Sequence, residues 1–206
     1  MQGLDIRIDW EAFVRGDETV FRQLYDTFFD VLYNYGCKYT SNRELVEDAI
    51  QGLFVRLWKT RERLSEPPSL KNYLFKAFRN HMIDLLKADG KYMADELGEQ
   101  HMFTLVPSPE QELVAGEQTA ALKKRIDVAL ERLSDRQREA IYLRFYEEYS
   151  YVDIADIMGI TVKATYKLMA RSISTLREQM GGSAVSVLLI LTAMGLTSQQ
   201  NRNGEK

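Results

Sequence analysis

Three basic residues near the end of the chain recur at helical spacing: Lys163, Lys167 and Arg171 stand at i, i+4 and i+8. At about 100° per residue, such positions share one face of a helix. A second face carries the residues expected in the core: Thr165, Met169, Ile173 and Leu176. The segment holds no acid before Glu178, so the basic face is suited to binding a polyanion such as nucleic acid.

The elements that would position this basic face are a short helix and a tight turn. Ser150 is a good N-cap for a helix over Tyr151–Met158, and Gly159 suits the left-handed residue that ends it. A second helix is expected over Val162–Gln179. A short helix, a glycine turn and a basic helix are the parts of a helix-turn-helix that enters the major groove. A charged face is also common on helices that simply contact water, so this pattern alone leaves both interpretations open.

Composition indicates an all-α protein. The 206 residues are 45% hydrophobic, with only 4 prolines, and no alternating strand pattern stands out. This length allows one large domain or two small ones. A net charge of −3 argues against non-specific coating of nucleic acid, because phosphate attraction dominates such binding. It permits segregated patches, or delivery to DNA by a larger partner.

The residue types that catalysis and metal binding require are scarce. Cys37 is the single cysteine, which excludes an internal disulfide, and it is predicted to be a small core side chain. His81 and His101 lack metal-ligand spacing. No nucleophile set or glycine-rich phosphate loop stands out. We therefore predict no enzyme activity, no metal, no cofactor and no small-molecule substrate. The N-terminus does not resemble a signal peptide, so a cytoplasmic location is expected.

Three long helices are predicted in the first half: Glu18–Tyr39, Arg43–Lys59 and Leu70–Lys87, capped by Asp17, Asn42 and Ser69. Trp10 and Phe13 indicate a short helix before them. The apolar face of the first long helix is expected to comprise Val20, Phe21, Leu24, Tyr25, Phe28, Val31, Leu32, Tyr35 and Tyr39. Residues 61–68 should form a loop, because Pro67-Pro68 cannot lie inside a helix.

Two surfaces in this half have more than one interpretation. Beside the apolar face of the 43–59 helix runs a polar and aromatic strip: Glu47, Asp48, Gln51, Phe54 and Trp58. It suits a protein interface, or ordinary boundary positions. The 70–87 helix interleaves basic residues with aromatic and amide side chains. That mixture suits single-stranded nucleic acid, or a solvated face on a core helix.

Residues 88–108 are acidic and lose hydrophobic spacing, which predicts a flexible linker. A helix is expected over Pro109–Arg132, and Ser134 with Gln137 forms a capping box for a helix over Asp135–Tyr146. With the helix-turn-helix, these make a four-helix domain. The apolar run Ala184–Leu196 is shorter than the roughly 20 residues of a membrane span. We expect it to pack on the C-terminal domain or on a protein partner, with membrane association as an alternative.

Four stretches, taken in order, resemble the extracytoplasmic-function (ECF) sigma factors of bacterial RNA polymerase, which belong to the sigma-70 family. DAIQGLFVRLW, residues 48–58, is similar to the family's D-x-x-Q-x-x-F-x-x-x-W segment. NYLFKAFRNHMIDLLK, residues 72–87, resembles the helix that meets the minus-ten element. LSDRQREAIYLRF, residues 133–145, and residues 150–177 resemble the minus-thirty-five reader. The similarity covers about residues 10–180.

The resemblance implies a domain division: 10–90 as sigma domain 2, 91–108 as linker, 109–180 as sigma domain 4, and 183–196 as an apolar tail helix. It implies that the chain binds core RNA polymerase, through the beta and beta-prime subunits. It also implies binding to promoter DNA, melted at the minus-ten element and double-stranded at the minus-thirty-five element. An anti-sigma or other regulatory protein is the further partner expected.

The resemblance also implies three sets of site residues. Polymerase would be held by Asp48, Gln51, Phe54 and Trp58. The minus-ten strand would be held by Arg61, Arg63, Ser69, Asn72, Tyr73, Lys76, Arg79 and Asn80. The minus-thirty-five element would be read by Arg144, Tyr151, Lys163, Ala164, Tyr166, Lys167 and Arg171. Ala164-Thr165 and Leu168-Met169 depart from the family's pattern, so the base preference is not predicted.

Two other classes of function compete with this interpretation. A stand-alone helix-turn-helix regulator would bind duplex DNA without polymerase, and it leaves the strip on the 43–59 helix unexplained. A helical protein-interaction adaptor would bind no DNA, and it leaves the acid-free basic helix unexplained.

Overall fold

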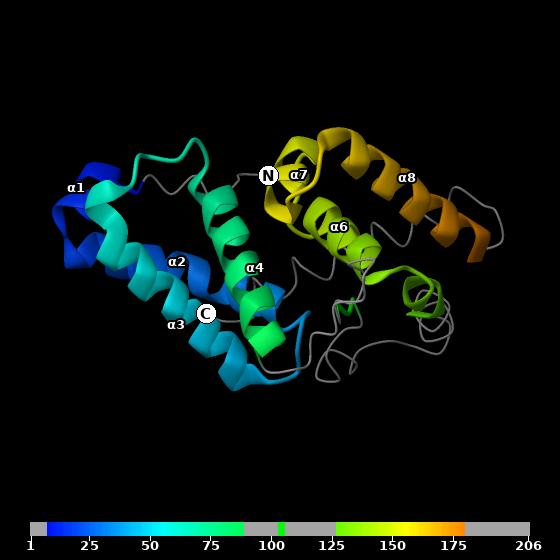
Figure 1. Cartoon of the computed structure of the whole chain (residues 1–206), viewed down its shortest axis with the longest axis horizontal. Helices are drawn as coiled ribbons and strands as arrows, with labels where there is room; N and C mark the ends of the chain where they lie inside the picture. The colour runs from blue at the N-terminus through cyan, green and yellow to red at the C-terminus, as the bar shows by residue number, and fades with distance from the viewer. Residues whose placement is uncertain (1–7, 89–102, 106–126, 180–206) are drawn as a thin grey trace, which may run out of the picture. The chain divides into compact units, whose positions relative to one another are not determined.

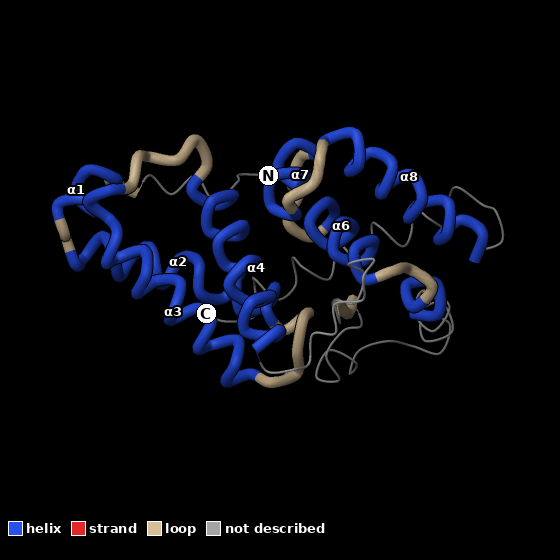
Figure 2. Tube along the Cα trace, viewed as in Figure 1, coloured by secondary structure: helices blue, strands red, loops and turns tan. Residues whose placement is uncertain are grey.

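The computed structural model describes residues 8–88, 103–105 and 127–179, and helices are the regular elements of these residues (Figures 1 and 2). The prediction of an all-α fold is confirmed. The chain divides into two compact units, Met1–Met93 and Ala94–Lys206. The predicted tail helix, most of the predicted linker and the predicted helix as far as residue 126 lie outside the described residues.

The first unit contains α1 (Trp10–Arg15), α2 (Glu18–Gly36), α3 (Arg43–Thr60), the 3₁₀ turn η1 (Arg61–Arg63) and α4 (Leu70–Ala88). The predicted caps form, because the Asp17 carboxylate accepts from Thr19 N at 2.8 Å and the Asn42 amide oxygen accepts from Leu45 N at 3.3 Å. Helix α2 ends at Gly36, three residues before the predicted end. The backbone turns there, with Lys38 N donating to the Tyr35 carbonyl at 3.1 Å.

The core of the first unit is rich in aromatic side chains and lies between α2, α3 and α4. Its largest fully buried members include Phe13, Tyr35, Tyr39, Ile50, Phe75, Phe78 and Met82. Two glycines let the helices approach closely. A Cβ atom on Gly36 would lie 2.5 Å from Val46 Cγ1, and one on Gly52 would lie 2.7 Å from His81 Nε2. Neither position has room for a side chain without a shift of its neighbours.

Several predicted core positions of the first unit are only half-buried: Val20, Phe21, Tyr25, Val31 and Cys37. The prediction that Cys37 is a core side chain is therefore wrong, because the chain has already left α2 at this residue. Burial nevertheless raises the pKa of the Cys37 thiol, chiefly by desolvation, which disfavours the reactive thiolate.

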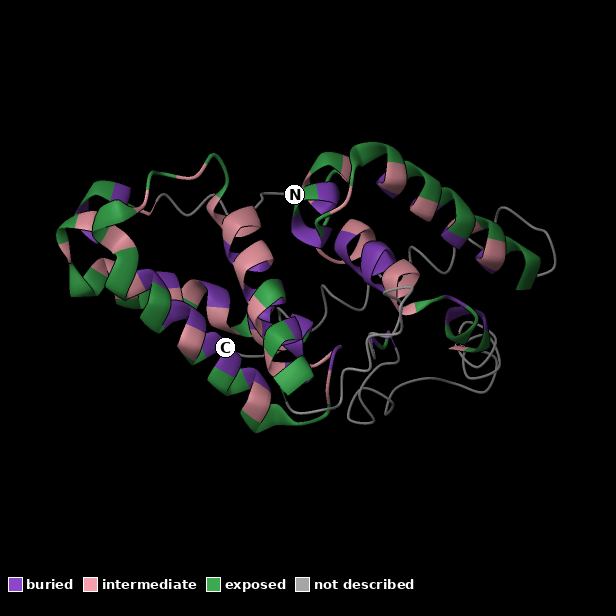
Figure 3. Ribbon diagram, viewed as in Figure 1, coloured by how far each residue is buried: buried purple, intermediate pink, exposed green. Residues whose placement is uncertain are grey.

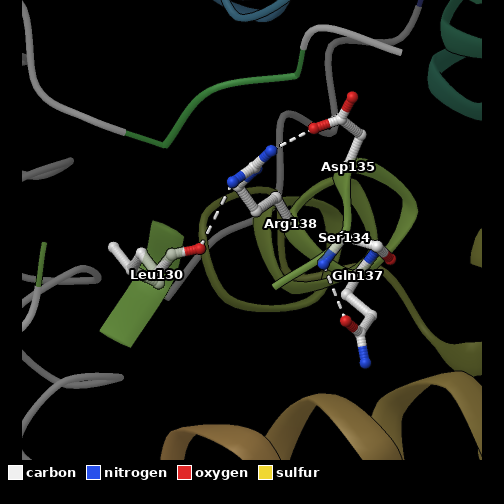
Figure 4. Close-up of polar contacts among 5 residues, drawn as sticks. All are labelled: Leu130, Ser134, Asp135, Gln137 and Arg138. Atoms are coloured by element: carbon white, nitrogen blue, oxygen red, sulfur yellow. Dashed lines mark hydrogen bonds and ion pairs between the residues drawn. The ribbon is translucent and has the colours of Figure 1, made fainter. Parts of the chain in front are cut away.

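The second unit contains α6 (Asp135–Phe145), α7 (Tyr151–Met158) and α8 (Val162–Gln179), and residues 127–131 are also helical. The bounds of α7 and α8 are the predicted ones. The predicted capping box is present, with Ser134 N donating to Gln137 Oε1 at 2.8 Å (Figure 4). Arg138 pairs with Asp135 and donates to the Leu130 carbonyl at 3.5 Å, which ties the preceding helix to α6.

A short part of the predicted linker is folded into the second unit. Phe103 and Leu105 are buried, at 1% and 2% exposure, and the Phe103 ring lies edge-on to Tyr142 with centroids 5.8 Å apart. The prediction of a flexible linker is therefore wrong at residues 103–105. Two apolar side chains at alternating positions are enough to seat this segment, although the acids around it dominate the composition.

None of the helices described here is both long enough and apolar enough to cross a membrane.

Candidate nucleic-acid interface

Local interactions fix the start of α7 and the turn between α7 and α8. Ser150 Oγ accepts from Asp153 N at 3.2 Å, and the Asp153 carboxylate accepts from Ser150 N at 3.2 Å. Gly159 adopts φ +66°, a left-handed conformation in which a residue with a Cβ atom is strained. Thr161 Oγ1 then accepts from Ala164 N at 3.1 Å and caps α8. Gly159 and the Thr161 cap together set the direction in which α8 leaves the turn.

Helix α8 separates a buried face from a basic one. Thr165, Met169, Ser172 and Leu176 are buried, while Ile173 is half-buried. Lys163, Lys167 and Arg171 are all exposed and form a row, called here the basic row. Figure 3 shows that one side of α8 is largely exposed along the helix. Within residues 127–179 none of these three side chains pairs with a carboxylate. Their charges are therefore available to a ligand.

Three other residues predicted in this site form a series of stacked contacts. Arg144 Nη1 donates to the Tyr149 carbonyl at 2.9 Å, and its guanidinium lies 5.5 Å from the Tyr151 ring centroid. The Tyr151 ring is perpendicular to Tyr166, with centroids 4.6 Å apart. Tyr166 itself is 58% exposed. Arg144 thus positions the tyrosine pair, whereas Ala164 is half-buried and presents little surface.

The strip on α3 is only partly a surface. Asp48 and Gln51 are exposed, but Phe54 is buried at 2% exposure. Its ring lies 4.9 Å from Tyr25 and 6.1 Å from Phe21, centroid to centroid, so α2 covers it. Phe54, one of the predicted polymerase-binding residues, therefore presents almost no surface to a partner in this structure. Val55, half exposed, is the apolar residue that α3 presents to solvent.

Trp58 and Arg61 support each other at the end of α3. The Trp58 ring is half-buried against Phe21, with centroids 4.7 Å apart. The Arg61 guanidinium lies 4.4 Å from the Trp58 ring centroid, and its Nη1 donates to the Trp58 carbonyl at 2.8 Å. Its Nη2 also pairs with Glu62 at 3.4 Å. Arg61 was predicted to contact DNA, but these contacts commit it to holding the η1 turn.

The predicted minus-ten residues differ in accessibility. Arg63, Ser69 and Asn80 are exposed, and Asn72, Tyr73 and Lys76 are half-buried. Arg79 is buried at 6% exposure, because it shares one row of α4 with the buried residues Phe75, Met82 and Leu86. Arg79, one of the predicted minus-ten residues, therefore presents little surface to a strand in this structure. Ser69 also caps α4, accepting from Asn72 N at 3.3 Å.

An aromatic stripe on α2 was not among the predicted sites. Phe21, Tyr25, Phe29 and Tyr33 follow each other at i+4 and are all half-buried. Adjacent centroids are 5.4 Å apart for Tyr25 and Phe29, and 5.8 Å apart for Phe29 and Tyr33. The four-residue spacing of these aromatics is visible in the sequence, but Phe21 and Tyr25 also fit the predicted apolar face, so the spacing alone does not separate the stripe from the core.

Charged side chains of both signs lie near this aromatic stripe. Burial raises the pKa of Tyr25, and the negative charges of Glu47 on α3 and Asp26 on α2 raise it further. At one end the stripe borders a hollow of about 390 Å³ lined by Glu18, Phe21, Arg22, Tyr25 and Trp58. Half-buried rings with charged side chains of both signs around them suit a protein interface.

Among the described residues, no cluster of three or more histidine, cysteine, aspartate or glutamate side chains could hold a metal ion.

The geometry defines a helical protein in two units, one of which carries a helix-turn-helix with an exposed basic row. Comparison with known families is more specific. Residues 24–92 match sigma-70 region 2, and residues 123–176 match sigma-70 region 4. The chain therefore belongs to the sigma-70 family and is an ECF sigma factor.

Individual relatives agree with this assignment. The chain is 24% identical over 159 residues to the RNA polymerase sigma factor YlaC of Bacillus subtilis, covering 76% of this chain and 90% of that one. It is 26% identical over 174 residues to the ECF RNA polymerase sigma factor SigL of Mycobacterium tuberculosis, covering 80% and 93%.

Two solved structures share the fold. CnrH, in complex with the cytosolic domain of CnrY, matches with a TM-score of 0.56 and 18% identity over 85% of this chain and 96% of that one. The sigma factor RpoE of Bartonella quintana, in complex with the anti-sigma factor NepR, matches with a TM-score of 0.54 and 23% identity over 77% and 95%.

Proposed function

We propose that this chain binds core RNA polymerase and directs promoter-specific transcription initiation. The observation that carries the proposal is the order of the matches: region 2 precedes region 4, and region 4 contains a helix-turn-helix with an exposed basic row. Residues 10–90 would dock on polymerase and open the minus-ten element, and residues 109–180 would read the minus-thirty-five element. Transcription initiation takes place on chromosomal DNA, so this chain would act in the cytoplasm.

Polymerase would bind to the face that α2 and α3 form together. Asp48 and Gln51 supply exposed polar groups, and the aromatic stripe of α2 supplies apolar area beside them. Phe54 acts from beneath, by holding α2 against α3. Aromatic residues are enriched at protein interfaces because they bury a large area at a small entropic cost.

The melted minus-ten strand would be contacted by the end of η1, the loop after it and the first half of α4. Arg63 and Asn80 are exposed, and Asn72, Tyr73 and Lys76 are accessible in part. Exposed bases stack on aromatic rings, and basic side chains follow the phosphates. Arg61 and Arg79 contribute through the shape of this surface rather than by touching the strand.

Contact with the minus-thirty-five duplex falls to α8. Lys163, Lys167 and Arg171 can meet phosphates or guanine edges in the major groove, and each good contact to guanine discriminates by about 1–3 kcal/mol. Three cations are few for a protein of net charge −3. Polymerase supplies most of the affinity in this proposal, and α8 selects the site.

A regulatory protein is the other proposed partner. The two solved structures that share the fold are each complexes with a partner protein, in one case an anti-sigma factor. The half-exposed aromatics of α2 are a surface that such a protein could compete for with polymerase.

Reconstitution tests the proposed function. Bacterial core RNA polymerase is mixed with the full chain and a promoter library, and the transcripts are sequenced to identify the promoters that support initiation. We expect sequence-selective initiation, which Lys167→Ala with Arg171→Ala abolishes. Asp48→Ala with Gln51→Ala should weaken polymerase binding, whereas the exposed acid of α1, changed by Glu11→Ala, is the control. Initiation without any sequence selection would refute the proposal.

A further inference from the structure

Exposed apolar side chains are concentrated on the helix-turn-helix. Five large apolar residues are markedly exposed in the described part of the chain: Val55, Val128, Val152, Val162 and Tyr166. Three of the five lie on α7 and α8, where Val152 is 62% exposed and Val162 39% exposed. Apolar surface left in water is unfavourable, so its concentration beside a basic row indicates a ligand with both apolar groups and negative charge.

The exposed apolar side chains of α8 form a separate row, called here the apolar row. Val162, Tyr166 and Ala170 stand at i, i+4 and i+8, each one residue before a member of the basic row. This apolar row is therefore turned by about 100° from the basic row. It lies on the flank nearer α7, because Tyr166 contacts Tyr151 at the start of α7. A ligand that covers the exposed side of α8 meets both rows at once.

The Tyr166 ring is held in place before any ligand arrives. Tyr151 packs against it at 4.6 Å, and Arg144 packs against Tyr151 while bonded to the Tyr149 carbonyl. A side chain that is already ordered loses little entropy on binding. An exposed yet fixed ring is well suited to discriminating between closely similar ligands.

Duplex DNA provides both kinds of group in one groove. Phosphates line its edges, and the apolar group on a base edge in the major groove is the 5-methyl of thymine. We propose that the apolar row, with Tyr166 at its centre, reads thymine methyl groups in the upstream promoter element, while the basic row holds phosphates and guanine edges. This inference rests on the proposed function, and it names the base feature that α8 selects.

The test removes single methyl groups from the DNA. The full chain with core polymerase first selects upstream elements from a randomised duplex. Each thymine of the best duplex is then replaced by deoxyuridine, which changes only the methyl group. We expect about fourfold weaker binding for each contacted methyl, which is the effect of exposing one methylene-sized group. In Tyr166→Ala the thymine and deoxyuridine duplexes should bind equally at one position.

Matched variants separate the apolar contact from other effects. Tyr166→Phe keeps the ring and should keep the methyl discrimination, and Val162→Ala should lose it at a different thymine. Val128→Ala, at an exposed valine away from α8, should change nothing. Unchanged thermal unfolding, followed by circular dichroism, shows that the variants fold.

Three results would overturn the inference. The deoxyuridine duplexes could all bind as tightly as thymine duplexes, or the discrimination could survive in both Tyr166→Ala and Val162→Ala. Tyr166→Ala could also weaken binding to polymerase on DNA without an upstream element, which would assign the apolar row to a protein partner. Failure of the proposed function looks different, because no upstream sequence would then be selected at all.

Discussion

The α2–α3 face of the first unit and the α7–α8 face of the second unit carry family motifs in opposite ways. On α8 the motif residues Lys163, Lys167 and Arg171 point to solvent, and the core side of the helix is separate. On α3 the motif residue Phe54 is buried, and Trp58 is half-buried under Arg61. A sequence motif therefore marks a contact surface in one unit and the support of a surface in the other.

The difference follows from how each helix is covered. Helix α3 packs against α2 on one side and α4 on another, so a residue beside its apolar face is covered too. Helix α8 packs on α6 and α7 through one face only, and the rest stays exposed. Substitution of the buried motif residue Phe54 should hence act mainly on stability, and substitutions in the basic row of α8 mainly on DNA selection.

The largest expected effect tests whether Phe54 supports the first unit. Phe54→Ala removes a ring packed on Tyr25 and Phe21, and such a change typically costs about 3–5 kcal/mol. Both tryptophans of the chain, Trp10 and Trp58, are in this unit, so tryptophan fluorescence during denaturant unfolding reports on it alone. Val55→Ala, at the exposed neighbour, should stay within about 0.5 kcal/mol. Equal losses of stability from the two substitutions would show that Phe54 is not a supporting core residue.

A smaller loss of stability is expected from Gly36→Ala. The added methyl would lie 2.5 Å from Val46 Cγ1 and 2.9 Å from Phe78 Cζ, and overpacking of this kind costs about 1–3 kcal/mol. Adding Val46→Ala should restore part of the loss, measured by the same fluorescence. Independent, additive effects of the two substitutions would show that α2 and α3 are not in close contact here.

Lys167→Ala should leave stability unchanged and act on DNA binding alone. Lys167 is exposed, and removing one phosphate contact lowers the slope of log affinity against log salt by about 1. Binding of the polymerase complex to its selected promoter is measured across a salt series. Glu178→Ala on the same helix should not reduce the slope. If Lys167→Ala has the same slope as the unsubstituted chain, Lys167 does not contact a phosphate.

The smallest expected effect is a pH dependence confined to the first unit. Burial, and to a lesser extent the positive charge of Arg56, lowers the pKa of His81, so the native state favours the neutral imidazole. The unfolded state then binds more protons below its pKa of about 6.5. This contribution makes stability rise as pH increases through that range and level off above it. The free energy of unfolding, measured by tryptophan fluorescence, should depend less on pH in His81→Gln than in the unsubstituted chain. An unchanged pH dependence would assign the effect to other groups.

Much of the secondary structure follows from local sequence. The caps Asp17, Asn42, Ser134 and Ser150 and the left-handed Gly159 are short-range signals, and they place helix ends where they are observed. The spacing of Thr165, Met169 and Leu176 likewise identifies the buried side of α8. These predictions succeed because each depends on residues within one or two helical turns.

Accessibility beside a core face depends on what packs there, and sequence does not specify that neighbour. Phe54 packs on α2 and Phe103 packs on Tyr142, and both contacts join segments that are far apart in the chain. Arg79 is buried although it is charged, because it lies in an apolar row. The basic row could be predicted from the spacing of three residues. The contacts by which Tyr151 and Arg144 fix Tyr166 are decided only by the tertiary structure, because α6 and α7 bring these side chains to that ring.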